Sequence, residues 1–401
     1  MKTDYFPGNR IDLLTSGAEY FPALLAAIDA AAYEVHLETY IFEDDITGRQ
    51  VAGALVRAAQ RGLAVRVLVD GFGAHDFMPT LGAELIAAGV EVLIYGPDIS
   101  PYTFRRHRLR RLHRKLAAID ARIAFVGGIN IIDDMNVGNK PTQIPPRHDY
   151  AVRIEGPLLA PIHASLRHLW KLVGWTTFRR RYRAPNFHVD AMAVCGDVTA
   201  AFVIRDNLRH RRDVEEVYLQ AIAGAENEVV LASAYFLPGR RFRQALMAAA
   251  RRGIKVVILL QGRVEYSLLH YATQSLYGAL LGAGVRIFEY HRSFLHAKVA
   301  VIDSRWATVG SSNIDPFSLL LSREANVVVR HHGFAHELRA SLQVAMDQGA
   351  QEVRSEDWQK KPLVARSASW LAFTLVRLMI GLSGYAQKDA VLYRGRSADR
   401  R

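Results

Sequence analysis

The chain has 401 residues, of which 50% are hydrophobic, so it is long and apolar enough for two folded domains and is not a disordered polypeptide. It contains 51 lysine and arginine residues against 39 aspartate and glutamate residues, a formal net charge of +12 that favours an anionic partner: nucleic acid, an acidic membrane surface or a phosphate-bearing substrate. The single cysteine, Cys195, excludes an intramolecular disulfide and a cysteine-based zinc site.

The first part of the chain alternates predicted helices and strands, after a polar N-terminus in which we expect no signal peptide. Gly62 and Gly89 directly follow two segments with helical spacing of apolar residues, and glycine is typical of a helix C-terminus. The predicted helices are Phe21–Ala32, Val51–Arg61 and Leu81–Ala88, and the predicted strands are Glu34–Phe42, Leu63–Val69 and Val90–Ile94. Such alternation predicts an α/β fold with parallel or mixed sheets covered by helices.

The second part repeats this order. Arg61–Gly71, RGLAVRVLVDG, corresponds to Arg252–Gly262, RGIKVVILLQG, and Leu81–Val92 corresponds to Leu276–Ile287. Here the predicted helices are Val214–Ala223, Phe242–Arg252 and Leu276–Gly282, and the predicted strands are Glu228–Phe236, Ile254–Leu260 and Val285–Tyr290. The sequence therefore predicts a duplicated α/β domain, with a first domain over 1–185, a second over 186–355 and a C-terminal tail over 356–401. A further helix is predicted over Gly156–Trp175, and Ala184–Asn186 is the predicted linker.

One motif occurs once in each half, as HRKLAAIDARIAFVGGIN at His113–Asn130 and HAKVAVIDSRWATVGSSN at His296–Asn313. Each copy begins with His-x-Lys, has Asp five positions after the Lys, and ends in a small-residue loop before Asn. The apolar runs between these residues predict two strands joined by a short turn, with His and Lys at the start of the first strand. A single copy would be typical of polar residues at the solvent-exposed end of a strand, but two copies with the same spacing indicate a functional site.

The duplicated pattern resembles the HKD motifs of the phospholipase D superfamily. Segments from Asn9 to about Ala345, including Ser233–Leu246 and Leu259–Ala272, resemble within it the cardiolipin synthase B group of bacteria. The superfamily resemblance implies two tandem α-β-α sandwich domains with mixed sheets, related by a pseudo-two-fold axis, whose histidines and lysines converge on one phosphodiester. The narrower resemblance implies a membrane-associated phosphatidyltransferase that makes cardiolipin from phosphatidylglycerol, releases glycerol and passes through a phosphohistidine.

The resemblance also implies roles for individual residues. The expected catalytic residues are His113, Lys115, Asp120, His296, Lys298 and Asp303. Asn130 and Asn313 are expected to bind the substrate phosphate, and Asp149 and Glu324, each at the start of a predicted strand, to orient the histidines. His113 is expected to be the nucleophile and His296 the acid and base, although the residues themselves do not order the two. Because two lysines supply positive charge, we expect no cofactor and no metal.

Other functions remain open at this stage. The same site suits a phospholipase D-type phosphodiesterase or nuclease acting on another phosphodiester, and a basic binding protein with a vestigial site is disfavoured because both motifs are complete. We expect an anionic phospholipid, phosphatidylglycerol, and the membrane surface as partners, and no nucleic acid. The expected location is the bacterial inner membrane, peripherally and on its cytoplasmic face. The acceptor alcohol and the oligomeric state are left open.

Two segments bear on membrane attachment. A basic insertion at Tyr102–Arg111 precedes the first motif and has no counterpart before the second, which favours either a solvated loop or the recruitment of anions. Ser369–Tyr385 is the most apolar run of the chain, with Arg377 in its middle. A central arginine is costly in a membrane span, so we expect a helix in the membrane interface, and packing on the protein core is the alternative.

Overall fold

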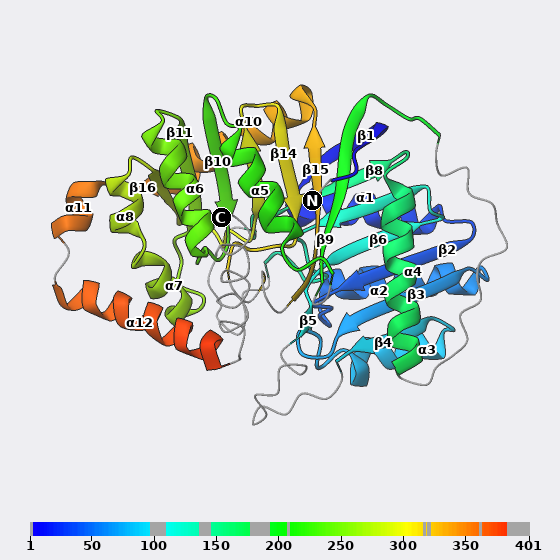
Figure 1. The fold of residues 1–401 in the computed structure, drawn as a ribbon. Coiled ribbons are helices and arrows are strands. Elements are labelled where there is room, and N and C mark those ends of the chain that lie inside the picture. The colour runs from blue at the N-terminus through cyan, green and yellow to red at the C-terminus, as the bar shows by residue number, and fades with distance from the viewer. Residues whose placement is uncertain are drawn as a thin grey trace, which may run out of the picture.

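The computed structural model describes residues 3–96, 110–135, 146–176, 193–206, 209–315, 318, 322–360 and 363–382. The predicted linker and the greater part of the basic insertion, with Arg105, Arg106 and Arg108, lie outside the described residues. Figure 1 shows the first half of the chain on the right and the second half on the left, joined through a shared central sheet.

The first half follows the predicted alternation, with an additional strand at its beginning. Its elements are β1 (Phe6–Thr15), α1 (Ser16–Asp29), β2 (Glu34–Thr39), α2 (Ile46–Gln60), β3 (Ala64–Asp70), the π-helical turn η1 (Met78–Gly82), α3 (Ala83–Ala87), β4 (Glu91–Tyr95), β5 (Arg111–Leu112), β6 (Lys115–Ile119), β7 (Ile123–Gly127), β8 (Tyr150–Glu155) and α4 (Leu159–Thr176). The predicted helix Leu81–Ala88 is shorter than expected, because its first residues belong to the η1 turn.

The second half repeats these elements and continues into two further helices. Its elements are β9 (Val198–Arg205), α5 (Asp213–Ala223), β10 (Glu228–Ser233), α6 (Arg240–Arg251), β11 (Lys255–Gln261), α7 (Ser267–Gln274), α8 (Tyr277–Gly282), β12 (Arg286–Tyr290), β13 (Lys298–Ile302), β14 (Trp306–Gly310), β15 (Ser322–Arg330), α10 (His332–Gly349), β16 (Ala350–Glu352), α11 (Ser355–Lys360) and α12 (Leu363–Leu382).

The strands form one continuous mixed sheet whose order reflects the duplication. Its path runs β16-β12-β11-β10-β13-β14-β15-β9-β1-β8-β7-β6-β2-β3-β4, and β5 pairs with β15 off this path. Outward from the antiparallel β9–β1 pair at the centre, corresponding strands of the two halves occur in the same order. This palindromic order is that of two repeats related by a pseudo-two-fold axis, so the predicted fold class is confirmed.

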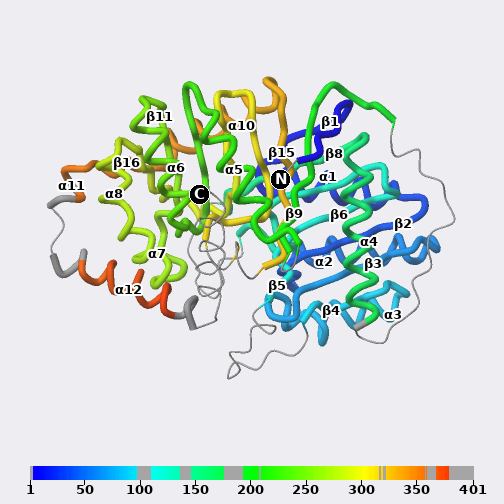
Figure 2. Tube along the Cα trace, in the orientation of Figure 1, coloured from blue at the N-terminus to red at the C-terminus, as the bar shows by residue number. Residues whose placement is uncertain are grey.

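Helices cover both faces of each half, as the trace in Figure 2 also shows. In the first half α1, α2 and α3 enclose one core with β2, β3 and β6, while α4 packs against the opposite face. In the second half α5, α6 and α8 form the corresponding core, and α10 packs on the other side. The cores beneath α4 and α10 are one cluster that runs through both halves, from Leu116 and Val152 to Val299 and Val327. This shared core fixes the two halves against each other.

The motif aspartates lie in the turns after β6 and β13. Asp120 and Ala121 both have positive φ, and Arg122 N–H donates to the Ile119 carbonyl, as in the type I′ turn that suits a tight hairpin. The Asp120 carboxylate accepts three backbone N–H groups, from Ala32, Tyr33 and Glu34, each at 2.8 Å. Asp303 repeats this with the N–H groups of Glu226, Asn227 and Glu228.

This position favours a structural role for Asp120 and Asp303 over the catalytic role expected from the sequence. Lys115 opens β6 and Asp120 follows its end, roughly 16 Å away at about 3.3 Å per residue. A carboxylate there is occupied with backbone donors and does not reach the reacting groups. Each aspartate instead attaches the backbone at the start of β2 or β10 to the turn of the motif hairpin.

Asp120→Ala should therefore destabilise the fold by about 2 to 3 kcal/mol, because it leaves three backbone donors without their acceptor. Urea unfolding measures this change, and Asp29→Ala is a matched control, since Asp29 is exposed and pairs with Arg57 on the surface. Equal effects of the two substitutions would contradict the structural role of Asp120.

Candidate active site

The histidine of each motif is held by the other half of the chain. In the first half β5 pairs with the start of β15, and His113 N–H donates to the Arg323 carbonyl at 3.0 Å. In the second half the segment before His296 forms a bridge with His148, and His296 N–H donates to the His148 carbonyl at 2.8 Å. The acidic residue that follows in sequence, Glu324 or Asp149, therefore lies beside the histidine of the opposite half.

His113 is paired with Glu324. Its Nδ1 atom lies 3.0 and 3.1 Å from the two carboxylate oxygens, and the Ser311 hydroxyl donates to one of these oxygens at 2.5 Å. Glu324 is fully buried, whereas 15% of the His113 side chain is exposed. The hydrogen bond fixes the ring with Nδ1 toward the protein and leaves Nε2 for a ligand.

His296 is paired with Asp149 in the same manner. The distance from Nδ1 to Asp149 Oδ2 is 2.6 Å, and the other carboxylate oxygen accepts Tyr150 N–H at 2.8 Å. The His296 side chain is 16% exposed, nearly the same as His113. Both carboxylates thus make the contacts expected of residues that orient the histidines, but each acts across the interface between the halves, which the sequence analysis did not anticipate.

The motif lysines are buried beside their histidines. Lys115 Nζ donates to the His113 carbonyl at 2.6 Å, and Lys298 Nζ donates to the His296 carbonyl and lies 3.5 Å from Asp149 Oδ2. Each lysine is held by the backbone of its own motif, and two cations are thereby brought into one enclosed place. Such a pair is suited to the non-bridging oxygens of a phosphodiester.

Burial and mutual repulsion lower the proton affinity of all four groups. Burial, then the neighbouring Lys298, lowers the pKa of His296 to about 3, and burial likewise lowers the pKa of His113. Burial lowers the pKa of Lys115 to about 7 and that of Lys298 to about 8, and each lysine loses part of its positive charge near these pH values. Both imidazoles are consequently neutral in the empty site at pH 7, with Nδ1–H donated to a carboxylate and a free lone pair on Nε2. A bound anion would raise the proton affinity of all four groups.

The motif asparagines are buried, and their binding of phosphate stays a prediction. Asn130 Oδ1 accepts Ile41 N–H at 3.2 Å, which ties the loop after β2 to the motif. Asn313 Nδ2 lies 3.5 Å from Ser318 Oγ, and Asn313 Oδ1 is buried without a hydrogen-bond partner among the described residues.

Tyr40 and Gly128 also belong to the site, and the sequence analysis missed them. The Tyr40 ring lies 5.0 Å from the His113 ring, and Lys115 Nζ is 5.4 Å from its centre. A side chain at Gly128 would collide with the Asp149 carboxylate, because an added Cβ would come within 2.4 Å of Oδ1. The small-residue run before Asn130 is a sequence signal for this close approach, whereas nothing in the sequence alone places Tyr40 beside His113.

A second cluster could be considered for a metal. Glu34 and His36 on β2 and His163 on α4 bring ligand atoms within 4.8 Å of one another. However, the buried Arg66 places Nη1 3.1 Å from His36 Nε2 and 3.3 Å from Glu34 Oε2. A guanidinium already neutralises the carboxylate there and would repel a cation, so this donor set does not fit a metal ion.

Comparison with known proteins agrees with this geometry. Residues 24–142 and 218–345, which contain one motif each, match the family described as the phospholipase D-like domain of cardiolipin synthase. The chain is 39% identical to cardiolipin synthase B of Escherichia coli (strain K12) over 385 residues, covering 96% of this chain and 92% of that protein. It is 30% identical to the cardiolipin synthase of Geobacillus kaustophilus over 92% of this chain and 72% of that protein. The resemblance drawn from the motifs is confirmed.

The fold also resembles a solved structure. The phosphatidylserine synthase of Haemophilus influenzae Rd KW20 superposes with a TM-score of 0.66, covering 95% of this chain and 96% of that chain. The sequence identity is 12%, so this likeness concerns the fold.

The electrostatic coupling within the site gives a direct test. Because Lys298 lowers the pKa of His296, Lys298→Met should raise that pKa by about one unit or more, although burial keeps it below 6.5. Histidine ¹⁵N chemical shifts recorded from pH 2 to pH 8 measure this change, with Lys255→Met, an exposed lysine on β11, as the control. An unchanged His296 titration in the Lys298 variant would show that the lysine does not act on this histidine.

Proposed function

This chain belongs to the cardiolipin synthase family of phospholipase D-like proteins, and we propose that it is an enzyme that transfers a phosphatidyl group from one phosphatidylglycerol to the headgroup hydroxyl of another, making cardiolipin and releasing glycerol. The observation that carries this proposal is the convergence of His113, Lys115, His296 and Lys298 in one enclosed site. The similarity to cardiolipin synthase B over 96% of the chain supports phosphatidyl transfer as the reaction.

In the first half-reaction, His113 Nε2 attacks phosphorus and the bond from phosphorus to the glycerol oxygen breaks. His296 gives a proton to the departing oxygen, so glycerol leaves as a neutral alcohol. Glu324 holds His113 in the tautomer with Nε2 free and stabilises the positive charge that develops on its ring. The product is a phosphatidyl group linked to His113.

The second half-reaction is the reverse with a different alcohol. His296, now neutral, takes the proton from the headgroup hydroxyl of a second phosphatidylglycerol, and the oxygen attacks phosphorus as the bond to His113 breaks. Water as the acceptor would yield phosphatidic acid, so exclusion of water decides between transfer and hydrolysis. Lys115 and Lys298 offset the charge on the phosphoryl oxygens in both steps, with Asn130 and Asn313 as amide donors.

His296 must be protonated for the first step, although its pKa in the empty site is low. The phosphodiester carries a negative charge into a site already occupied by two lysines and two carboxylates. Its arrival favours the protonated imidazole, and Asp149 at 2.6 Å stabilises that cation. Substrate binding thus supplies the condition for proton transfer.

A peripheral contact with the bilayer is part of this proposal. No helix within the described residues is long and apolar enough to cross a membrane. Helix α12 packs on α7, and Ala372 and Val376 belong to the core of the second half, so the alternative of core packing holds for one of its faces. Its outer face carries exposed apolar side chains, at Trp370, Leu371, Leu375 and Leu378. Arg377 lies on the exposed side with its guanidinium 5.7 Å from the Phe373 ring centre.

We infer that this outer face of α12 enters the interfacial region of an anionic membrane, at the cytoplasmic face of the bacterial inner membrane. Helix α12 is apolar on two opposite faces, one packed on the protein and one exposed. An exposed apolar face of this kind is typical of a surface that contacts a membrane or another protein. Trp370 suits the interface, and Arg377 is placed to reach lipid phosphates from the same helix. Phosphatidylglycerol would then be drawn from the leaflet in which the helix is embedded.

His113→Ala and His296→Ala should each lower cardiolipin formation from phosphatidylglycerol vesicles by about a thousand-fold or more, because each step needs both imidazoles. Lipid mass spectrometry of the products measures the rate. His332→Ala, a solvent-side histidine on α10, is the control and should keep wild-type activity. Retention of normal turnover by either motif variant would remove that histidine from the mechanism.

Replacing the outer face of α12, with Trp370→Ser, Leu371→Ser and Leu375→Gln together, should reduce flotation with anionic vesicles at least about tenfold. Ile46→Gln with Val344→Gln is a matched control, since both side chains are exposed and apolar but lie on other helices. If the α12 variant floats as well as the control, the bilayer contact lies elsewhere on the protein.

A further inference from the structure

The two halves differ beside their motif histidines, although their backbones correspond. The last residue of the strand is Thr39 in β2 and Ser233 in β10, and its hydroxyl donates to the backbone carbonyl two residues further on, at 2.8 Å in both halves. The residue that follows the strand is Tyr40 in the first half and Ala234 in the second. An aromatic ring is therefore present at this position in one half and absent from the other.

The Tyr40 ring contacts both reacting groups of the first motif. Its centre lies 5.0 Å from the centre of the His113 ring, and Lys115 Nζ lies over its face, 5.4 Å from the centre. A cation within about 6 Å of the centre of an aromatic ring is attracted by its π face. Gly73 backs the ring so closely that an added Cβ would come within 2.8 Å of a ring carbon. The position of the ring is thus fixed by the loop behind it.

The two motif lysines have different neighbours. Asp149 Oδ2 lies 3.5 Å from Lys298 Nζ, whereas no carboxylate of the described residues forms an ion pair with Lys115. Conversely, no aromatic ring of the described residues makes a cation–π contact with Lys298. The charge of Lys298 is therefore supported by a carboxylate, and that of Lys115 by the face of a ring.

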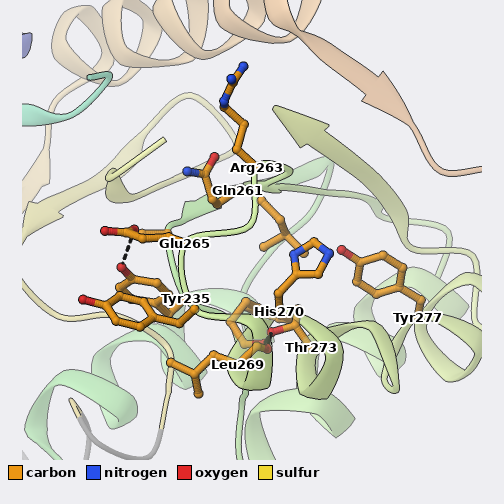
Figure 3. Close-up of a pocket in the computed structure, with 12 residues that line it drawn as sticks. Tyr235, Gln261, Arg263, Glu265, Leu269, His270, Thr273 and Tyr277 are labelled. Carbon is orange, nitrogen blue, oxygen red and sulfur yellow. Dashed lines mark hydrogen bonds between the residues drawn. The ribbon is translucent and has the colours of Figure 1, made fainter. Parts of the chain in front are cut away.

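Tyr235, the nearest aromatic residue after Ala234, does not replace the missing ring. Its hydroxyl donates to Glu265 at 2.6 Å, as Figure 3 shows, and its ring packs edge-on against Tyr266 with 5.7 Å between the centres. No ring contact joins Tyr235 to His296 within the described part of the chain. The contact made by Tyr40 thus has no counterpart in the second half.

The charge of Lys115 depends on its surroundings, because burial lowers its pKa to about 7. His113, next to it on the same segment, is neutral in the empty site. The Tyr40 hydroxyl stays protonated, since burial and the nearby Asp70 raise its pKa, so Tyr40 offers a neutral ring and not a phenolate. Three carboxylates favour the charge of the lysine from other strands and one lysine opposes it: Glu324 on β15, Asp149 before β8, Asp70 on β3 and Lys298 on β13.

A ring suits this position better than a further carboxylate would. The site already contains Asp149 and Glu324, and a third negative charge would repel the phosphodiester. The π face attracts an ammonium group without adding negative charge. The same ring adjoins His113, whose imidazole becomes positively charged when Nε2 bonds to phosphorus.

We propose that Tyr40 is a positioning residue of the first motif, whose ring keeps Lys115 protonated for phosphate binding and favours the cationic state of His113 during phosphatidyl transfer. This inference rests on the proposed function. The ring does for Lys115 what the Asp149 carboxylate does for Lys298. It also separates the roles of the two histidines, because His296 has no such ring beside it.

A titration of the lysines measures the contact directly. In protein labelled with ¹³C at lysine Cε, the Lys115 signal is assigned from its absence in Lys115→Met and followed from pH 4 to pH 11. Tyr40→Leu should lower its midpoint by about one pH unit, because the attraction between the ring and a buried ammonium group is lost. Tyr40→Phe keeps the face of the ring and should leave the midpoint unchanged. Tyr33→Leu, at the exposed opposite end of β2, is the matched control.

The pH dependence of the reaction gives a second readout. In Tyr40→Leu the alkaline limb of kcat/KM for phosphatidylglycerol in mixed micelles should move to lower pH by about one unit, because Lys115 of the free enzyme loses its proton sooner. Above both midpoints the rate should be about tenfold below that of the wild-type protein. Tyr40→Phe should follow the wild-type profile. A variant that is only less stable would lose rate without this displacement of the limb.

Two results would overturn the role of Tyr40. One is an unchanged Lys115 midpoint in Tyr40→Leu, and the other is an equal displacement in Tyr40→Phe, which would assign the effect to the hydroxyl instead of the ring. The lysine titration needs no substrate. A wild-type protein that made no cardiolipin would therefore refute the proposed function, while the displaced Lys115 midpoint would still support the contact.

Discussion

The structure depends on the pairing of each motif histidine with a carboxylate from the opposite half of the chain. Glu324 binds His113 and Asp149 binds His296, and the backbone hydrogen bonds beside these pairs also cross between halves. Neither half alone can therefore hold its own histidine in the reactive tautomer. The palindromic sheet order and the core shared beneath α4 and α10 bring both crossings to one place. The single site can therefore form only when both halves of the duplicated fold are packed together.

Burial of four titratable groups in one site makes their protonation depend on the binding of an anion. Two neighbouring lysines in a buried site bind protons weakly. The pKa is about 7 for Lys115 and about 8 for Lys298. The site is thus unfavourable for positive charge until an anion arrives, and a phosphodiester relieves that repulsion. Binding and proton supply are consequently linked, because the same anion that fills the site also favours the protonated form of His296.

The duplicated motifs were enough to predict the fold class, the pseudo-symmetry and the residues that converge, since regular spacing reports both the hairpin and its repeat. The boundaries of the helices and strands, and the residues that contact each other across the fold, were harder to predict from the sequence. The strand β1 was not predicted, because the glycine and proline in Phe6–Thr15 obscure its alternation. Asp120 could be identified as part of the pattern, but only the structure shows that its carboxylate serves backbone donors. The pairing of Glu324 and Asp149 with the histidine of the opposite half requires the tertiary arrangement, because sequence spacing does not indicate which strands lie next to each other.

The central claim is most directly tested by observing the two histidines separately when one carboxylate is neutralised. With ¹⁵N-labelled histidine, Asp149→Asn should change the Nδ1 resonance of His296 and leave that of His113 unchanged, and Glu324→Gln should do the converse. Assignment follows from the spectra of the corresponding histidine variants. This result would establish that each half orients the histidine of the other. If Asp149→Asn instead altered the resonance of His113, the carboxylate would serve its own half, and the proposed construction of the site from two crossed pairs would be wrong.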